Sequence, residues 1–289
     1  MSRKKVALRI EEGEVERLKG KFSTDNQSET IRLAILQSFA TEDSKKVKTL
    51  FPYIGKKPSR IDREVVNAFE QSECKIFVDL FCGSLAMLCY LPWDTKVVVN
   101  DINGNLTNLY MVIGDRPSDF VSVVMKLPYS EVVFQKCKED LKSGSTMSDL
   151  NRAVAHFYVS FGAYRGRMEN PLFCFSASAD MNRAEDFQES IQWILQLSKR
   201  QQNVEILNRD FRKVLQSYNT EDVFVYADCP YLETEDYYEY LFTVQDHIDL
   251  AEMLKTHKGK FVFRNSFYQF QWFALNHIQK ISSKCIQII

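Results

Sequence analysis

Residues 222–231 read Asp-Val-Phe-Val-Tyr-Ala-Asp-Cys-Pro-Tyr. The first part, 222–227, is a short apolar run typical of a fully buried strand. Similar runs occupy 75–81, 95–100, 203–207 and 260–264, and helical candidates lie between the strands at 61–70, 103–112, 185–199, 210–218 and 246–256. Such alternation indicates an α/β fold with a mostly parallel sheet covered on both faces. The polar residues from Asp228 onward therefore follow a parallel strand, where such sheets bind ligands.

The chain outside this pattern divides into smaller parts. Between 114 and 200 the strand signal fades, and amphipathic stretches at 118–126, 131–141 and 149–161 predict a helical insertion within a main domain that covers 51–289. Residues 42–50 have the polar composition of a linker. Residues 1–41 precede the linker as a separate small unit.

Composition excludes several classes of protein. Hydrophobic residues make up 45% and charged residues 26%, which is typical of a soluble globular protein. No apolar run approaches the roughly 20 residues that span a bilayer, and the basic start leads into a charged segment, unlike a signal peptide. The 7 cysteines are scattered, odd in number and never spaced Cys-x-x-Cys. They predict reduced thiols in the cytoplasm, with neither a metal site nor a disulfide framework.

The first ten residues form a basic arm on a chain whose net charge is only -1. From Lys5 to Ile10 apolar and polar residues alternate as in a half-buried strand, and two helical stretches follow, the second capped by Ser28. A lone strand with two helices cannot bury a stable core. We therefore expect this strand to pair with the same strand of a second chain, or else the unit to pack against the main domain.

This strand–helix–helix unit resembles the ribbon-helix-helix DNA-binding proteins of the Arc/MetJ type. The resemblance implies a homodimer whose two-stranded ribbon enters the major groove of double-stranded DNA. Lys5, Ala7 and Arg9 would face the base edges, and the helix N-terminus at Ser28 would hold a phosphate. The alternative for the basic arm alone is a solvated tail.

An adenosine-type cofactor site is indicated by two further strand ends. Asp79 lies near the end of the run 75–81, which leads into a turn at Gly83, and such an acidic residue can hold a cationic amino group. Asp101 follows the next strand 22 residues later, close to the spacing at which a carboxylate meets ribose hydroxyls. The alternative for Asp101 is an N-cap or Asx-turn residue before the helix at 103.

Together these segments resemble the Dam-like DNA adenine N6-methyltransferases, over about residues 51–265. The similar motifs, in order, are Phe51-Pro-Tyr-Ile-Gly-Lys-Lys57, Asp79-Leu-Phe-Cys-Gly83, Asn100-Asp-Ile-Asn103, Asn208-Arg-Asp-Phe211, Asp228-Cys-Pro-Tyr231, and His247 with Leu250-Ala251. The resemblance implies a Rossmann-like fold that uses S-adenosylmethionine. It assigns to the cofactor Tyr53, Lys57, Asp79, Phe81, Gly83, Asp101, Asp210 and Phe211.

The resemblance places catalysis at Asp228, Cys229, Pro230 and Tyr231. An exocyclic amine conjugated to a purine is a poor nucleophile, because its lone pair is delocalised into the ring. The Asp228 carboxylate and the Cys229 carbonyl would accept its two hydrogens, and Tyr231 would stack on a base flipped out of the duplex. No metal is needed, since positioning and electrostatics carry the reaction. By the same resemblance alone, aspartate rather than serine at 228 favours adenine over cytosine N4 as the target.

The chain departs from the family pattern at a few positions. Ser84 and Leu85 replace glycines, Cys229 replaces a proline, and Lys56 replaces the second glycine of the opening motif. We expect Leu85 to add bulk where the methionyl part of the cofactor approaches. These changes leave open the alternative of a catalytically degenerate, methyltransferase-like regulator that binds DNA.

An aromatic and basic segment at 157–167 resembles the part of the family that lies near the target DNA, although it lacks the family's asparagine. In this segment Arg165 and Arg167 are candidate DNA contacts. The alternative is that both are solvated surface residues.

Overall fold

The structure is a computed structural model that describes residues 47–51, 59–143, 146–178, 180–230 and 241–264. The strand and helices expected within residues 1–41 lie outside these ranges. So do the predicted site residues Lys5, Ala7, Arg9, Ser28, Tyr53, Lys57 and Tyr231.

The centre of the described chain is a parallel sheet of 5 strands in the order β3-β2-β1-β4-β5. The strands are β1 (Ile76–Asp79), β2 (Lys96–Asn100), β3 (Val204–Leu207), β4 (Val223–Asp228) and β5 (Lys260–Arg264). Each coincides, within two residues, with an apolar run picked out in the sequence, so the prediction of a parallel α/β sheet is confirmed. The strand order reverses between β1 and β4, and an open α/β sheet binds its ligand at the carboxyl ends beside such a reversal.

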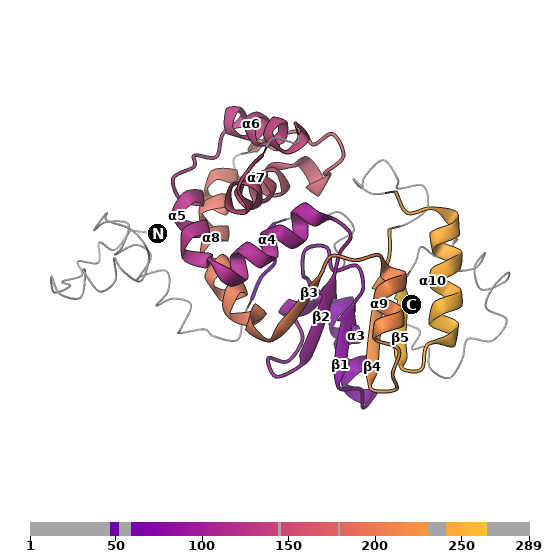
Figure 1. Cartoon of the computed structure of the whole chain (residues 1–289). Coiled ribbons are helices and arrows are strands. Elements are labelled where there is room, and N and C mark those ends of the chain that lie inside the picture. The colour runs from indigo at the N-terminus through magenta and orange to yellow at the C-terminus, as the bar shows by residue number, and fades with distance from the viewer. Residues whose placement is uncertain (1–46, 52–58, 144–145, 179, 231–240, 265–289) are drawn as a thin grey trace, which may run out of the picture.

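Both faces of the sheet are buried, which explains why its strands are continuously apolar. On one face Phe77 and Phe224 stack with their ring centroids 5.6 Å apart, under α3 (Ser59–Gln71) and α4 (Gly104–Asp115). On the other face Val78 and Val225 pack under α9 (Phe211–Ser217) and α10 (Val244–Thr256). Figure 1 shows this layered arrangement around the sheet.

The amphipathic stretches between β2 and β3 are helices. They form α5 (Pro117–Val124), α6 (Glu131–Lys142) and α7 (Asp149–Gly162), and α8 (Arg183–Arg200) returns the chain toward the sheet. Phe157 of α7 and Phe187 of α8 belong to the same buried cluster as Phe77 of the sheet. The helical group therefore shares a core with the sheet, and it lies beyond the carboxyl ends of the strands in Figure 1.

Short 3-10 turns complete the described elements: η1 (Met87–Cys89), η2 (Tyr164–Gly166) and η3 (Gln201–Asn203). Among the helices of the described residues, none is both long enough and apolar enough to cross a membrane.

Candidate active site

Acidic side chains gather where β1, β2 and β4 end. Asp79 and Asp228 are the last residues of β1 and β4, and Asp101 comes directly after β2. Asp79 is only 2% exposed, and its Oδ1 has no hydrogen-bond partner among the described residues. Burial raises its pKa well above the usual value, and the negative charges of Asp228, Asp101 and Asp62 raise it further. A buried, crowded acceptor of this kind suits a cationic ligand that replaces the missing partner.

The turn after β1 is fixed by the turn after β2. The amide of Gly83 donates to Asp101 Oδ2 at 3.1 Å, and the amide of Asn103 donates to Asp101 Oδ1 at 2.9 Å. Tyr110 closes the loop from α4, because its hydroxyl donates to the Gly83 carbonyl at 2.5 Å. Gly83 has φ 45°, a conformation that glycine adopts without strain. The two predicted cofactor residues, Gly83 and Asp101, are thus brought together by direct contact.

Asp101 is an Asx-turn residue, as its alternative reading proposed, but it does not cap the following helix. Asn103 is the N-cap of α4, and its Oδ1 accepts from the amides of Asn105 at 2.9 Å and Leu106 at 3.1 Å. Burial raises the pKa of Asp101, while the backbone hydrogen bonds oppose this effect. Each carboxylate oxygen can accept more than one hydrogen bond, so the turn leaves Asp101 able to meet a ligand hydroxyl.

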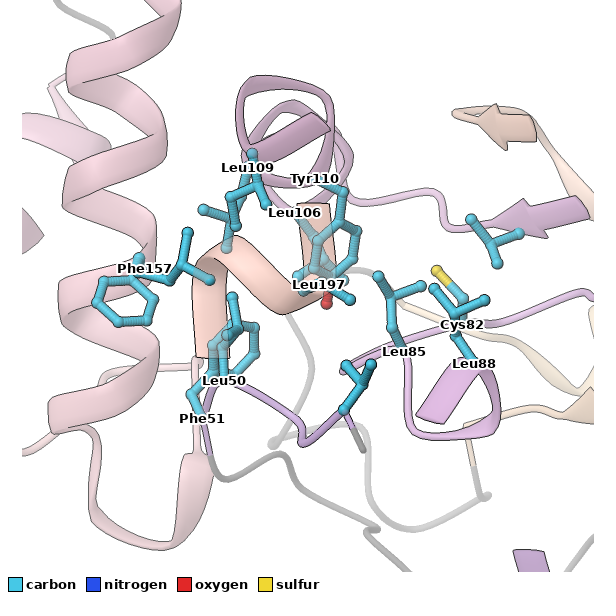
Figure 2. Packing of buried hydrophobic residues seen from close by; sticks show 14 of the residues in the cluster. Leu50, Phe51, Cys82, Leu85, Leu88, Leu106, Leu109, Tyr110, Phe157 and Leu197 are labelled. Atoms are coloured by element: carbon cyan, nitrogen blue, oxygen red, sulfur yellow. The ribbon is translucent and has the colours of Figure 1, made fainter. Parts of the chain in front are cut away.

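Leu85, which the sequence led us to expect beside the methionyl part of the cofactor, packs into the core of the free protein. Its exposure is 0%, and it lies in the same buried cluster as Cys82, Leu88 and Leu197, as Figure 2 shows. Leu85 has φ 58°, which costs a non-glycine residue about 1–2 kcal/mol, while burying a leucine gains about 1.5–3 kcal/mol. The core therefore accommodates a leucine at position 85, where the family pattern has a glycine.

An aromatic group lies beside the acidic edge. The ring centroids of Phe81 and Phe211, both predicted from the sequence, are 5.8 Å apart. Phe242 packs against both rings, with centroids at 5.5 Å from Phe81 and 5.6 Å from Phe211. Asp210 caps the N-terminus of α9, because its Oδ1 accepts from the amide of Arg212 at 2.8 Å. The arrangement provides apolar ring faces and one half-exposed carboxylate, which together suit a flat heterocycle that carries an amino group.

The sequence interpretation missed Phe242, although a local signal marks it. Phe242 precedes Thr243, which caps α10 in a reciprocal capping box with Asp246. A hydrophobic residue before such a cap usually packs against the fourth helical residue, which here is His247. The ring centroids of Phe242 and His247 are 4.7 Å apart.

Arg212 connects α9 to α10 beside this aromatic group, with its guanidinium 4.4 Å from the Phe211 ring centroid. Its guanidinium contacts Asp210 at 3.1 Å, Asp246 at 2.6 Å and Asp249 at 2.5 Å. Asp246 also belongs to the capping box of α10, so one arginine connects the caps of both helices. This network fixes Asp210 and Phe211 relative to the helix that carries His247.

The end of β4 places Asp228 at the site and turns Cys229 away from solvent. The Tyr226 hydroxyl donates to Asp228 Oδ2 at 3.2 Å. Cys229 is 3% exposed, lies in the cluster under α10, and has its Sγ 3.7 Å from His247 Nδ1. Pro230, the next predicted residue, is half-buried at the end of this described segment. The cysteine in place of proline thus fills part of the core.

The basic segment after α7 forms a tight turn on the surface. Ala163 bridges to Phe173, the amide of Tyr164 donates to the Leu172 carbonyl at 2.8 Å, and the amide of Cys174 donates to the Gly162 carbonyl at 2.7 Å. Arg165 and Arg167 are both exposed. They lie at some distance along the chain from the acidic residues, on the helical group that extends beyond the carboxyl ends of the strands (Figure 1).

Comparison with known proteins agrees with this geometry. Residues 53–288 match the family described as D12 class N6 adenine-specific DNA methyltransferase. The chain is 24% identical to Type II methyltransferase M.CviBI of Paramecium bursaria Chlorella virus NC1A, over 74% of this chain and 81% of that protein. It is 27% identical to Retron Ec67 DNA adenine methylase of Escherichia coli, over 62% of this chain and 63% of that protein.

A third relative is Type II methyltransferase M1.LlaDCHI of Lactococcus lactis subsp. cremoris, 26% identical over 65% of this chain and 69% of that protein. The family match covers the whole described sheet, both turns of the acidic edge and the aromatic group. The chain belongs to the D12 class of N6 adenine-specific DNA methyltransferases.

Proposed function

We propose that this DNA adenine methyltransferase joins S-adenosylmethionine and a flipped adenine at the edge formed by Asp79, Asp101 and Asp228. The observation that carries the proposal is the placement of Asp79 and Asp228 on either side of the strand-order reversal, at the ends of β1 and β4. One carboxylate is then available to the cofactor and the other to the target base.

The described residues fit S-adenosylmethionine. Asp79 Oδ1 is a buried acceptor without a partner among the described residues, and it suits the ammonium group of the methionyl part. Asp101 accepts a hydrogen bond from the amide of Gly83 in the turn after β1, and it suits the ribose hydroxyls. Phe81, Phe211 and Phe242 offer faces for the adenine ring, with Asp210 near its amino group. When bound, the cofactor supplies a methyl group already activated on a sulfonium centre.

The target adenine is assigned to Asp228 and the backbone that follows it. The carboxylate accepts a hydrogen bond from N6–H, which favours a nitrogen lone pair directed at the methyl group. As positive charge develops on N6, the carboxylate also stabilises it. The Cys229 carbonyl is the second acceptor in this proposal, and Pro230 restricts the backbone beside it. The proposed stacking residue, Tyr231, lies outside the described residues.

The turn after α7 is the proposed contact with duplex DNA near the active site. Arg165 and Arg167 suit phosphate oxygens, and Arg165 lies over the Tyr164 ring at 5.3 Å. Leu172 and Phe175 are 69% and 68% exposed on the same turn region. Apolar side chains at such a surface suit the unstacked bases that remain when an adenine leaves the helix.

The N-terminal unit is proposed from its sequence to act as a dimeric ribbon-helix-helix reader. Lys5, Ala7, Arg9 and Ser28 are its expected DNA contacts. Tethering would raise the local concentration of the catalytic domain near its sites. The cytoplasm is the proposed location, supported by the 6 cysteines among the described residues, which remain thiols and form no disulfide there.

Product analysis tests the proposed function. Unmethylated duplex DNA is incubated with the full chain and S-adenosylmethionine that carries a labelled methyl group, and the nucleosides are separated after digestion. We expect the label in N6-methyladenine. Label in N4-methylcytosine, or DNA that binds the protein and gains no label, contradicts the proposal.

A further inference from the structure

The turn that follows α7 has a strained backbone on the surface of the helical group. Arg165 has φ 56°, a left-handed conformation that an arginine rarely adopts, and its side chain is exposed. Leu85 has a similar φ but is buried, so packing offsets the cost there. No such burial stabilises Arg165. A strained residue persists only where its surroundings fix the backbone, and such residues cluster at functional sites.

Tyr129 and Arg183 fix the chain on both sides of this turn. Where α7 ends, Arg183 Nη2 donates to the Phe161 carbonyl at 2.7 Å, and the guanidinium lies 4.6 Å from the Phe161 ring centroid. Where the chain returns, the amide of Arg183 donates to Ser176 Oγ at 3.1 Å. The Tyr129 hydroxyl donates to the Cys174 carbonyl on the same side. We call this pair of residues the turn clamp.

The turn clamp is largely buried, whereas several side chains of the turn are exposed. The side chain of Arg183 is only 12% exposed, and Tyr129 packs against the buried core of the helical group. Leu172 and Phe175, which lie in the same turn, are exposed like Arg165. Ordering a surface turn costs conformational entropy, and burying a guanidinium costs free energy unless its hydrogens are paired. A connection that only joined α7 to α8 would need neither.

The guanidinium of Arg183 makes three contacts at once because it is planar and forked. It donates to the Phe161 carbonyl, lies over the Phe161 ring, and pairs with Asp186 Oδ2 through Nη1 at 3.3 Å. An ammonium group lacks both the plane and the fork, so lysine cannot reproduce the full set. With these contacts and so little exposure, Arg183 is poorly placed to bind a DNA phosphate itself. Its effect on DNA binding must therefore pass through the turn.

We infer that Tyr129 and Arg183 are positioning residues for DNA binding, which hold the turn in its binding conformation before the duplex arrives. This inference rests on the proposed contact of Arg165 with DNA. A turn that is ordered in advance loses less conformational entropy on binding, which raises its affinity. The contacts of the turn clamp lie within the helical group, whereas the proposed cofactor site lies at the strand ends. Loss of the clamp should therefore weaken DNA binding without a matching loss of cofactor affinity.

Conservative variants separate this role from simple packing. Tyr129→Phe keeps the ring and removes only the hydroxyl. Arg183→Met keeps much of the apolar stem and removes the guanidinium, and Arg183→Lys returns only the charge. Arg152→Met is the matched control. It removes an arginine that pairs with an aspartate three residues away, as Arg183 does, but at the opposite end of α7.

The experiment measures, for the full chain of each variant, the Kd for a fluorescently labelled, unmethylated DNA duplex by anisotropy at one fixed salt concentration. The cofactor Kd by calorimetry and the single-turnover transfer rate at saturating DNA are measured on the same preparations. We expect Arg183→Met and Arg183→Lys to raise the DNA Kd about tenfold, and Tyr129→Phe about threefold. The cofactor Kd and the transfer rate should stay within about twofold of wild type. Arg152→Met should match wild type throughout.

Two outcomes overturn the inference. One is a wild-type DNA Kd in both Arg183→Met and Tyr129→Phe. The other is a cofactor Kd that rises in parallel with the DNA Kd, because the two residues would then support the fold as a whole.

Arg165→Ala separates the inference from the proposal on which it rests. If Arg165→Ala raises the DNA Kd and the clamp variants do not, the inference alone fails. If Arg165→Ala binds DNA like wild type, the proposed contact fails, and the inference fails with it. A wild-type protein that transfers no methyl group contradicts the proposed function, and the DNA Kd still tests the inference.

Discussion

The ring of Phe242 packs at 87° against the ring of His247, with the centroids 4.7 Å apart. This contact joins the residue before the α10 cap to the first full turn of the helix, and it holds Phe242 against Phe81 and Phe211. A helix-capping contact thereby completes the aromatic group at the proposed cofactor site.

Removing the Phe242 ring should weaken cofactor binding. We expect Phe242→Ala to raise the Kd for S-adenosylmethionine about tenfold, because a ring contact with a flat heterocycle is worth roughly 1 kcal/mol or more. Calorimetric titration measures this change. Leu241→Ala is the control, since Leu241 is the neighbouring residue and is 66% exposed. Equal affinities in wild type and Phe242→Ala would place the adenine ring elsewhere.

The ionised Asp79 carboxylate should lower the stability of the protein when no cofactor is bound. Burial, followed by the charges of Asp228 and Asp101, raises its folded-state pKa above the unfolded value. The stability that Asp79 contributes is therefore fully present below the unfolded pKa and is lost as pH rises through the folded pKa. Asp79→Asn removes the buried charge. It should raise Tm by about 3 °C at pH 8, with a smaller gain at pH 5.

The same variant should lose affinity for S-adenosylmethionine, since the acceptor for the ammonium group is neutralised. Thermal unfolding at pH 8 and pH 5 measures the change in stability, and calorimetry of each variant measures the change in cofactor affinity. Asp115→Asn is the control, because the Asp115 side chain is 80% exposed. A less stable Asp79→Asn at pH 8 would show that the ionised carboxylate is well satisfied in the free protein.

The Arg212 network should contribute to stability and to the geometry of Asp210. We expect Arg212→Met to lower the free energy of unfolding by about 1–2 kcal/mol, because it leaves Asp210, Asp246 and Asp249 without their shared cation. Arg212→Lys should recover only part, since an ammonium cannot reproduce the forked contacts. Urea unfolding measures both, with exposed Lys213→Met as the control. A loss no larger in Arg212→Met than in Lys213→Met contradicts this role.

Buried histidines should make the fold sensitive to mild acid. Burial lowers the pKa of His156 to about 4, and that of His247 to about 4. Between pH 6.5 and 4 the unfolded chain binds protons at these sites and the folded chain does not. Each histidine's contribution to the free energy of unfolding is therefore fully present above the unfolded-state pKa. It is lost as the pH drops toward 4, which lowers the free energy of unfolding by up to about 3 kcal/mol for each group.

A variant isolates this effect at one site. His156→Leu places an apolar side chain in the core and removes one titrating group. Urea midpoints at pH 7, 5.5 and 4.5 should fall less steeply in this variant than in wild type. Parallel curves for the two proteins would show that His156 does not remain neutral in the folded state.

The sequence predicted the sheet well, because strands buried on both faces leave uninterrupted apolar runs. It also predicted which residues lie at the carboxyl ends of the strands, such as Asp101 and Asp228, since strand ends and glycine turns are local features. Phe242 was missed although the capping box after it is a local signal, and its contacts with Phe81 and Phe211 could not be predicted because they join segments far apart in the chain.

Leu85 shows what residue identity leaves undetermined. Comparison with a glycine-containing pattern indicated bulk beside the cofactor, and in the structure the leucine has φ 58° and is buried in the core. Residue identity alone does not specify on which side of a turn a side chain lies. Backbone conformation, which tertiary packing selects, decides it.

The most direct measurement is the single-turnover rate of methyl transfer to duplex DNA by wild type and by Asp228→Asn, with the cofactor Kd determined on the same preparations. We expect Asp228→Asn to bind S-adenosylmethionine within about threefold of wild type and to transfer the methyl group about 10³-fold more slowly. Transfer by Asp228→Asn at the wild-type rate would contradict the assignment of the β4 edge as the site of adenine methylation.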